Sequence, residues 1–229
     1  MNLDVILFQL FPYVAVAVAL VESIRRYGRE RFSYSSLSSQ FLEGNQLFLG
    51  SVPWHYGILI VLLGHLVAFL FPQQILAFNR VPVRLYILEV TALAWGLLTL
   101  VGLLSLIVRR LWFPRIRAVT SAMDLILLGV LLIQVGLGVY IALNLRWGSS
   151  WYALALVPYL RSLCVLRPDL TLLIPLPWGI KAHILGAFVF LALLPFSRLA
   201  HLLVVPWAYL WRQPQLVIWN RCPGSARRP

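Results

Sequence analysis

The sequence predicts an all-α integral membrane protein with five transmembrane helices. Of its 229 residues, 61% are apolar and 11% are charged, whereas soluble domains average about 45–50% apolar and about 25% charged residues. Five stretches contain about 20 mostly apolar residues, the length that a helix needs to cross a bilayer. Such a chain has too little polar surface to form a water-soluble globule, and its apolar content also excludes a disordered protein.

The order of the chain gives the expected spans and the connections between them. The spans are Leu3–Ile24, Ser51–Phe71, Val83–Val108, Ala122–Leu145 and Gly179–Trp207. The first span lacks the basic segment and the small-residue cleavage site of a cleavable signal peptide. No connection is long enough for an independent soluble domain. We therefore expect one membrane domain at 1–208 and a tail at 209–229.

The charges indicate how the chain is oriented. It has 19 Lys and Arg against 7 Asp and Glu, a net charge of +12. In so apolar a chain this excess is typical of charges that flank membrane spans, not of a nucleic-acid surface. Thirteen of these cations fall in the first and third connections and near the C-terminus, against six on the other side. The positive-inside rule then places the N-terminus outside and the C-terminus in the cytoplasm of a multi-pass cell-membrane protein.

All four histidines lie in two of the spans, His55 and His65 in the second and His183 and His201 in the fifth. Ionisable residues at membrane depth are costly and usually functional. One such residue often makes only a hydrogen bond between helices, but four in this arrangement indicate ligands. Along a helix, about 15 Å separate the first pair and about 27 Å the second, and eighteen residues are a whole number of turns, which puts the second pair on one face.

Antiparallel spans determine which histidines can meet. The second span runs outward and the fifth inward, so His55 pairs with His201 near the cytoplasm and His65 with His183 near the outside. The two separations differ by about 12 Å, which a large planar cofactor tolerates better than a compact zinc site. Two imidazoles per iron match a bis-histidine haem b. The sequence therefore predicts two haems b held between the second and fifth helices.

Other metal chemistry finds less support. Zinc and manganese sites normally include carboxylates or thiolates, and the spans carry almost none. The two cysteines, Cys164 and Cys222, form no CxxC or CxxCH motif, which removes zinc knuckles, thiol redox motifs and covalently attached haem.

Small and basic residues near the histidines have two interpretations each. Gly57, Gly64 and Gly186 would let a flat ring approach a helix, but ordinary helix packing uses small residues in the same way. Four arginines of the third connection could pair with haem propionates, although the positive-inside rule already explains their charges. They are Arg109, Arg110, Arg115 and Arg117.

Several short motifs resemble one known family. In the first half of the chain they are Phe11-Pro12-Tyr13, Arg26-Tyr27, Ser38-Ser39-Gln40, His55-Tyr56-Gly57-Ile58-Leu59 and Gly64-His65. In the second half they are Arg109-Arg110, Pro114-Arg115-Ile116-Arg117-Ala118, Thr120, Asp124, His183 and Pro195-Phe196-Ser197-Arg198-Leu199 followed by His201. Together these residues resemble the gamma subunit of respiratory nitrate reductase, the membrane cytochrome b of a quinol:nitrate oxidoreductase.

The resemblance implies an electron-transfer role. It assigns His65 and His183 to a distal haem b near the outer surface and His55 and His201 to a proximal haem b near the cytoplasm. It also implies a cytoplasmic iron–sulfur (beta) subunit and a molybdenum (alpha) subunit that reduces nitrate to nitrite. The gamma subunit itself would oxidise quinol and carry no catalytic residue for nitrate. The apolar tail side chains Trp211, Ile218 and Trp219 either dock on the iron–sulfur subunit or form an interfacial helix on the lipid.

The quinol site departs from the family pattern. The family has a lysine early in the third span, whereas this chain has none between Val81 and Tyr86. Arg84 or Tyr86 could donate to a quinone oxygen instead, and an interfacial anchor is the other interpretation of Arg84. The candidate quinol-binding residues are Gly64, His65, Arg84 and Tyr86.

Two other functions stay open from the sequence. A related di-haem b subunit could oxidise quinol for another cytoplasmic reductase that acts on heterodisulfides or sulfur compounds. A transporter or a haem-free anchor belongs to a different class, but the chain has neither the interrupted helices nor the inverted repeats of transporters.

Overall fold

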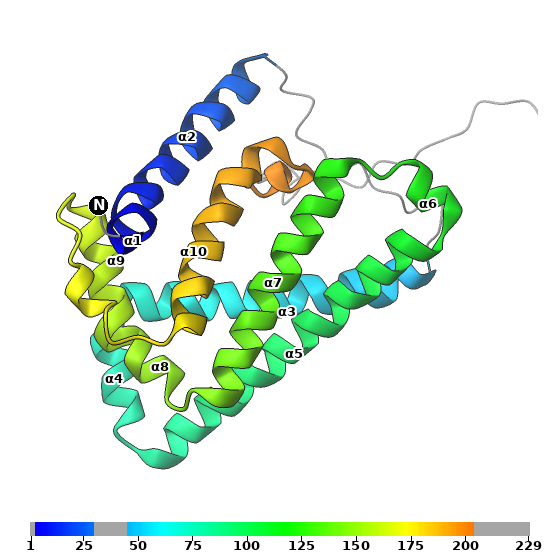
Figure 1. Cartoon of the computed structure of the whole chain (residues 1–229). Coiled ribbons are helices and arrows are strands. Elements are labelled where there is room, and N and C mark those ends of the chain that lie inside the picture. Colours follow the sequence, from blue (N-terminus) through cyan, green and yellow to red (C-terminus); the bar gives the residue numbers. More distant parts are fainter. Residues whose placement is uncertain (1–2, 30–44, 204–229) are drawn as a thin grey trace, which may run out of the picture.

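The computed structural model describes residues 3–29 and 45–203, and within these ranges it consists of helices and turns with no strand (Figure 1). Within these ranges, five helical stretches are long and apolar enough to cross a membrane, and they overlap the five predicted spans. They are Leu3–Arg29, Leu47–Leu70, Pro82–Trp112, Ala122–Asn144 and Trp178–Phe196.

The first span is a continuous rod of three helical segments, α1 (Leu3–Val5), the π-helix η1 (Ile6–Leu10) and α2 (Phe11–Arg29). The π-turn directly precedes Phe11-Pro12. Proline has no N–H to donate to the preceding turn and its ring crowds the carbonyl there, and a wider turn relieves both conflicts. A second π-helix, η3 (Tyr152–Leu156), precedes Pro158 in the same way.

The second and third spans pack along each other. They are α3 (Asn45–Leu70) and α5 (Pro82–Trp112), joined through the short α4 (Pro72–Asn79). A Cβ on Gly102 would stand 2.5 Å from the main-chain nitrogen of Trp54, and one on Gly57 would meet Thr99. The absence of side chains at these two glycines therefore lets the helices approach closely. Of the two interpretations of Gly57, close approach of a flat ring and ordinary helix packing, the structure shows helix packing.

The fourth span joins the two halves of the bundle. After α6 (Pro114–Ala118), α7 (Ala122–Asn144) begins with a capping box, in which the side chains and main-chain nitrogens of Ser121 and Asp124 bond reciprocally. This arrangement satisfies two N–H groups that a helix start leaves unpaired. Helix α7 packs on α5 and on α10 (Trp178–Leu193), and α10 packs on α2.

The fifth span corrects one prediction. A single helix over 179–207 was expected, but α10 ends at Leu193 and continues as the 3₁₀ segments η5 (Leu194–Phe196) and η6 (Arg198–Leu203). Pro195 cannot donate to a helical carbonyl, so the regular ladder stops there. Residues 204–207 lie outside the described residues. The expectation that His183 and His201 share one face of one helix is therefore wrong.

The fourth connection is structured. It contains α8 (Gly148–Trp151), η3, α9 (Val157–Cys164) and the 3₁₀ turn η4 (Leu170–Leu172). The side chain of Tyr159 is completely buried, and its hydroxyl donates to the carbonyl of Phe8 at 2.7 Å. Tyr13 in turn donates to the carbonyl of Leu163 at 3.1 Å. The connection thus packs against the first span and closes one end of the bundle.

The two ends of the bundle differ in composition. The α4 end holds α4, α8, α9 and the beginning of the first span, and the α6 end holds α6, η5, η6 and the end of α2 (Figure 1). The described arginines that were expected on the cytoplasmic side gather at the α6 end. They are Arg25, Arg26, Arg29, Arg109, Arg110, Arg115, Arg117 and Arg198. The tail at 209–229 lies outside the described residues.

Candidate functional site

Three of the four histidines are held in the same way. In each, Nδ1 lies within 2.8 Å of a main-chain carbonyl three or four residues earlier, and a carbonyl oxygen can only accept. Nδ1 therefore carries the proton and donates it, and the lone pair of Nε2 is left available. The bonds run from His55 to Ser51 at 2.7 Å, from His65 to Val61 at 2.8 Å and from His201 to Arg198 at 2.7 Å.

The fourth histidine has a different environment. The side-chain amide of Gln134, on α7, donates to the carbonyl of His183 at 3.0 Å, and its nitrogen lies 3.5 Å from Nε2 of the His183 ring. Nδ1 of His183 is buried without a hydrogen-bond partner among the described residues. Sequence reasoning missed Gln134, although an amide in the middle of an apolar span is a visible signal.

Two of the histidines lie toward the α4 end of the bundle. His65 lies near the end of α3 and His183 near the beginning of α10. At the α6 end, His201 lies on η6, and His55 lies on α3 nearer that end than His65. The rings of His55 and His65 are exposed, because α3 packs mainly on α5 and leaves this face open. Among the described residues, no three His, Cys, Asp or Glu side chains gather as metal ligands.

Residues of the fourth connection complete the surroundings of His65. The ring of Tyr152 packs edge-on against the imidazole, 5.4 Å between centroids, and its hydroxyl donates to the carbonyl of His65 at 3.3 Å. Burial raises the pKa of the Tyr152 phenol, so that the hydroxyl keeps its proton. Arg161 donates to the carbonyl of Phe69 at 2.8 Å. A Cβ on Gly64 would meet nothing within 4 Å, so the surface next to His65 is open.

The two other quinol candidates lie apart from this group. The guanidinium of Arg84 stands over the ring of Phe78 at 5.8 Å, and Tyr86 packs edge-on against Trp147 at 5.3 Å. Neither has a hydrogen bond or ring contact with His65 within the part of the chain that the structure describes.

An ionic network holds the segment that carries His201. Asp124 forms ion pairs with Arg110 at 2.8 Å and with Arg198 at 3.1 Å, and Arg198 also donates to the carbonyl of Val119 at 3.0 Å. We call Asp124, Arg110 and Arg198 the α6-end network. Arg110, one of the four arginines of the third connection, therefore has a partner within the protein.

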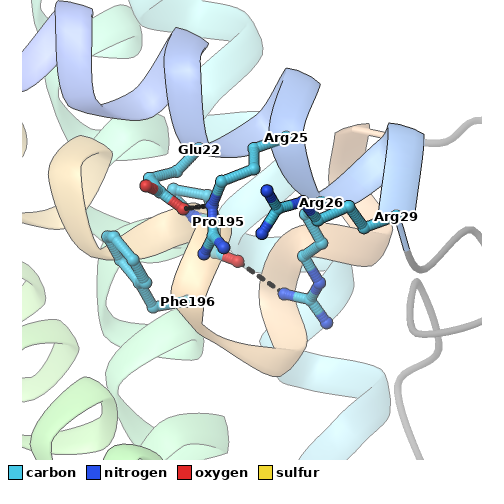
Figure 2. A pocket seen from close by; sticks show the side chains of 6 residues that line it. All are labelled: Glu22, Arg25, Arg26, Arg29, Pro195 and Phe196. Carbon is cyan, nitrogen blue, oxygen red and sulfur yellow. Dashed lines mark hydrogen bonds and ion pairs between the residues drawn. The ribbon is translucent and has the colours of Figure 1, made fainter.

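The end of α2 holds the same segment from the other side. Figure 2 shows Arg26 reaching from α2 to the carbonyl of Pro195, and Arg26 also donates to the carbonyl of Ser197 at 3.0 Å. Arg25, Arg29 and Phe196 line the hollow beside it. A 3₁₀ segment is intrinsically weak, so these contacts from two helices fix the place of η6.

Comparison with known proteins identifies the family. The model of the nitrate reductase gamma subunit family matches residues 4–220. The chain belongs to this family. It is 32% identical over 210 residues to the nitrate reductase gamma chain of Bacillus subtilis, which covers 90% of this chain and 94% of that protein. It is 32% identical over 218 residues to the respiratory nitrate reductase 1 gamma chain of Escherichia coli, and this alignment covers 94% of this chain and 97% of that protein.

A third relative is longer. The chain is 30% identical over 223 residues to the nitrate reductase-like protein NarX of Mycobacterium tuberculosis, which covers 95% of this chain but 34% of that protein. Together the matches and the five apolar helices make this gamma subunit a multi-pass cell-membrane protein and a component of an electron-transport oxidoreductase. The resemblance given by the short motifs is thereby confirmed.

Proposed function

We propose that this gamma subunit is the membrane cytochrome b subunit of a quinol:nitrate oxidoreductase. It oxidises quinol near the outer face and delivers the electrons, by way of two bis-histidine haems b, to a cytoplasmic iron–sulfur subunit of a molybdenum nitrate reductase. His65 and His183 hold the distal haem, and His55 and His201 hold the proximal one. The N-terminus is outside and the α6 end faces the cytoplasm.

The arrangement of the ring nitrogens carries this proposal. A histidine that binds a metal through Nε2 has its proton on Nδ1 and donates it to a nearby acceptor, which fixes the tautomer and the ring. His55, His65 and His201 have this arrangement. An imidazole retained only for a hydrogen bond between helices would use that nitrogen across the helix interface instead of on its own helix.

The surroundings of the histidines also fit a flat group. His55 and His65 stand on the exposed face of α3, and Gly64 leaves the surface beside His65 without a side chain. Apart from its histidine ligands, a haem requires apolar side chains around the ring. Helix α3 supplies them with exposed side chains such as Leu62 and Leu66. A haem ligated by two histidines is coordinatively saturated and supplies one-electron transfer.

The protein contributes binding and orientation of quinol at the α4 end. Quinol must be bound beside the distal site, because a saturated iron offers no position to it. Gly64, His65, Arg84 and Tyr86 are the proposed residues, and oxidation there releases the two quinol protons on the outer side. Tyr152, whose hydroxyl keeps its proton, adds a polar group next to His65.

The α6 end is the proposed docking face for the cytoplasmic subunits. It carries most of the described arginines, and two of the relatives are named gamma chains, which indicates that those proteins are parts of larger reductases. The tail docks there through its tryptophans. Deletion of 210–229 should weaken retention of the iron–sulfur (beta) and molybdenum (alpha) subunits without loss of haem, and unchanged retention contradicts the docking.

The experiment that tests the haem assignment is single replacement of each histidine by alanine. Each variant should contain one haem per chain instead of two by the pyridine haemochrome assay, and the lost haem should be the same for His65 and His183. Thr91→Val is the matched control, since its hydroxyl bonds only to its own helix in α5. Two haems after any histidine replacement contradict the assignment.

The purified complex also distinguishes the alternative functions. A reduced-minus-oxidised spectrum without b-type bands would indicate a transporter or a haem-free anchor. Co-purification of a partner without molybdenum would indicate an anchor for a heterodisulfide or sulfur reductase. The three matches named above are nitrate reductase chains or nitrate reductase-like, which favours nitrate as the terminal acceptor.

A further inference from the structure

Glu89 is an acidic side chain inside the apolar helix α5. It is the eighth residue of that helix, is partly buried and forms no ion pair with a Lys or Arg of the described residues. Its Oε1 accepts instead from the main-chain N–H of Ser149 at 2.9 Å and from the hydroxyl of the same residue at 2.7 Å. A carboxylate at membrane depth is costly, and two donors on one oxygen offset part of that cost. Glu89 thus ties α5 to the first turn of α8.

Asn79 holds the same turn from α4. Its side-chain nitrogen donates to the hydroxyls of Ser149 and Ser150, at 2.9 Å in both bonds. A Cβ on Gly148 would stand 3.3 Å from Oε2 of Glu89, so the absence of a side chain there lets the turn approach the carboxylate. We call Asn79, Glu89, Ser149 and Ser150 the α4-end cluster, because they join α4, α5 and α8 where these helices meet (Figure 1).

Glu89 lies at nearly the same level of the bundle as His65. In the antiparallel pair of α3 and α5, Trp54 lies beside Gly102. Counting along both helices from this contact brings His65 within two residues of the level of Glu89, which is about 3 Å along the axes. One short segment that crosses the two helices can therefore contact both side chains.

The segment that begins at α8 makes both contacts. Ser149 bonds to Glu89, and α8 continues directly into η3, so that Tyr152 follows Ser149 by one turn. The ring of Tyr152 packs edge-on against the imidazole of His65 at 5.4 Å, and its hydroxyl donates to the carbonyl of His65 at 3.3 Å. The place of this ring beside His65 is thus set by where the preceding turn is anchored.

We propose that Glu89 is a positioning residue of the distal site: by fixing Ser149 it holds the ring of Tyr152 against the imidazole of His65. This inference rests on the proposed function, in which His65 ligates the distal haem. The ring of Tyr152 covers one side of the imidazole. Loss of this cover makes the surroundings of the ligand more polar, which favours the oxidised iron because it carries the larger positive charge. Glu89 therefore raises the reduction potential of the distal haem and leaves that of the proximal haem unchanged.

The test is an optical redox titration of the complete complex in membranes, with the wild type, Glu89→Leu and Glu89→Gln compared. Leu removes the acceptor, whereas Gln loses the charge but retains an acceptor oxygen for Ser149. In Glu89→Leu we expect the ratio of reduced to oxidised distal haem at a fixed potential to fall about threefold, which is about 28 mV for one electron. Glu89→Gln should keep the wild-type potential. Thr91→Val, in the same helix, is the control.

Two further measurements test the path through Tyr152. Tyr152→Leu should lower the distal potential by the same factor, and the double variant with Glu89→Leu should show no further fall, because residues that act through one chain of contacts are not additive. Hydrogen exchange of the main-chain amides of 148–156 should be faster in Glu89→Leu than in the wild type and unchanged in Glu89→Gln. Ser149→Ala, which removes only the hydroxyl bonds, should give a smaller fall of the same sign and tests the proposal even if Glu89→Leu does not assemble.

Selective loss of the distal haem from Glu89→Leu, with retention in Glu89→Gln, also supports the positioning role. Equal shifts in Glu89→Leu and Glu89→Gln overturn it, since they mean that the charge of the carboxylate acts on the haem. Unchanged potentials in Glu89→Leu or additive shifts in the double variant overturn it as well. A wild-type complex without two b-type haems would instead contradict the proposed function, so the two failures are distinguishable.

Discussion

Replacement of Asp124 by asparagine should destabilise the α6 end more than any other change of a single charge. Asp124 is buried, and its carboxylate joins three elements, because it pairs with Arg110 of α5 and Arg198 of η6 while it caps α7. Asparagine has the same shape but no charge. The change leaves two guanidinium groups facing each other without the anion between them.

The structure sets the expected size of this effect. Breaking a buried ion pair costs about 3–5 kcal/mol, and an exposed pair contributes about 0–1 kcal/mol. The side chain of Asp124 is 7% exposed, whereas those of Arg110 and Arg198 are 19% and 25% exposed. The pairs therefore lie between the two limits, and we expect a loss of about 2–3 kcal/mol in the free energy of unfolding. For a chain of this size the thermal midpoint should fall by about 5–10 °C.

The assay is thermal unfolding of the purified complex in detergent, followed by tryptophan fluorescence. Glu22→Gln is the matched control, since the same change removes a pair with Arg25 whose side chains are 25% and 52% exposed, and its midpoint should shift by less than about 3 °C. The distal haem should remain fully bound in Asp124→Asn, while binding of the proximal haem weakens. Equal midpoints for the two variants would refute the reasoning.

Four further predictions concern the rest of the chain and the complete complex. Tyr159→Phe should lower the free energy of unfolding by about 1 kcal/mol. Because burial raises the pKa of this phenol, the wild type should lose stability above about pH 10, whereas the variant should not. Unfolding measured at pH 8 and at pH 10.5 tests both expectations. Gly102→Ala should lower the thermal midpoint by separating α3 from α5, whereas Gly129→Ala, where a Cβ meets nothing within 4 Å, should not. Replacement of Arg84 or Tyr86 should slow haem reduction by quinol but spare nitrate reduction by an artificial cytoplasmic donor. Vesicles with the complete complex should acidify the outer side, and proton release on the inner side contradicts the proposed site.

Hydropathy located the spans because a bilayer requires a fixed length of apolar helix. The third span was expected at Val83–Val108 and runs from Pro82 to Trp112, so the difference lies in the polar ends that hydropathy does not register. The fourth connection was not predicted to be structured. Its apolar residues are too few for a span, and their burial depends on contact with Phe8, more than 140 residues away in sequence.

The candidate site was predictable only to the level of residue type. Histidines confined to two spans are a sequence signal, and the bond from Nδ1 to a nearby carbonyl is local. The partners of Asp124 and His183 depend on how four helices meet, which no local pattern contains. Pro195 is a visible signal for the end of a regular helix, although the apolar run continues to 207.

The two ends of the bundle use different chemistry to hold a histidine, and depth in the membrane explains the choice. The α6-end network is ionic and lies in the first turn of α7, where arginines can reach water and headgroups, so the cost of burying charge is small. Gln134 lies ten residues beyond Asp124 on the same helix, which is about 15 Å further along the axis. A charged residue near the bilayer centre costs about 2.5–3.5 kcal/mol, whereas a neutral amide avoids most of that cost and still donates to the carbonyl of His183. An aspartate at position 134 would therefore disrupt the bundle, and an asparagine at 124 removes what holds η6.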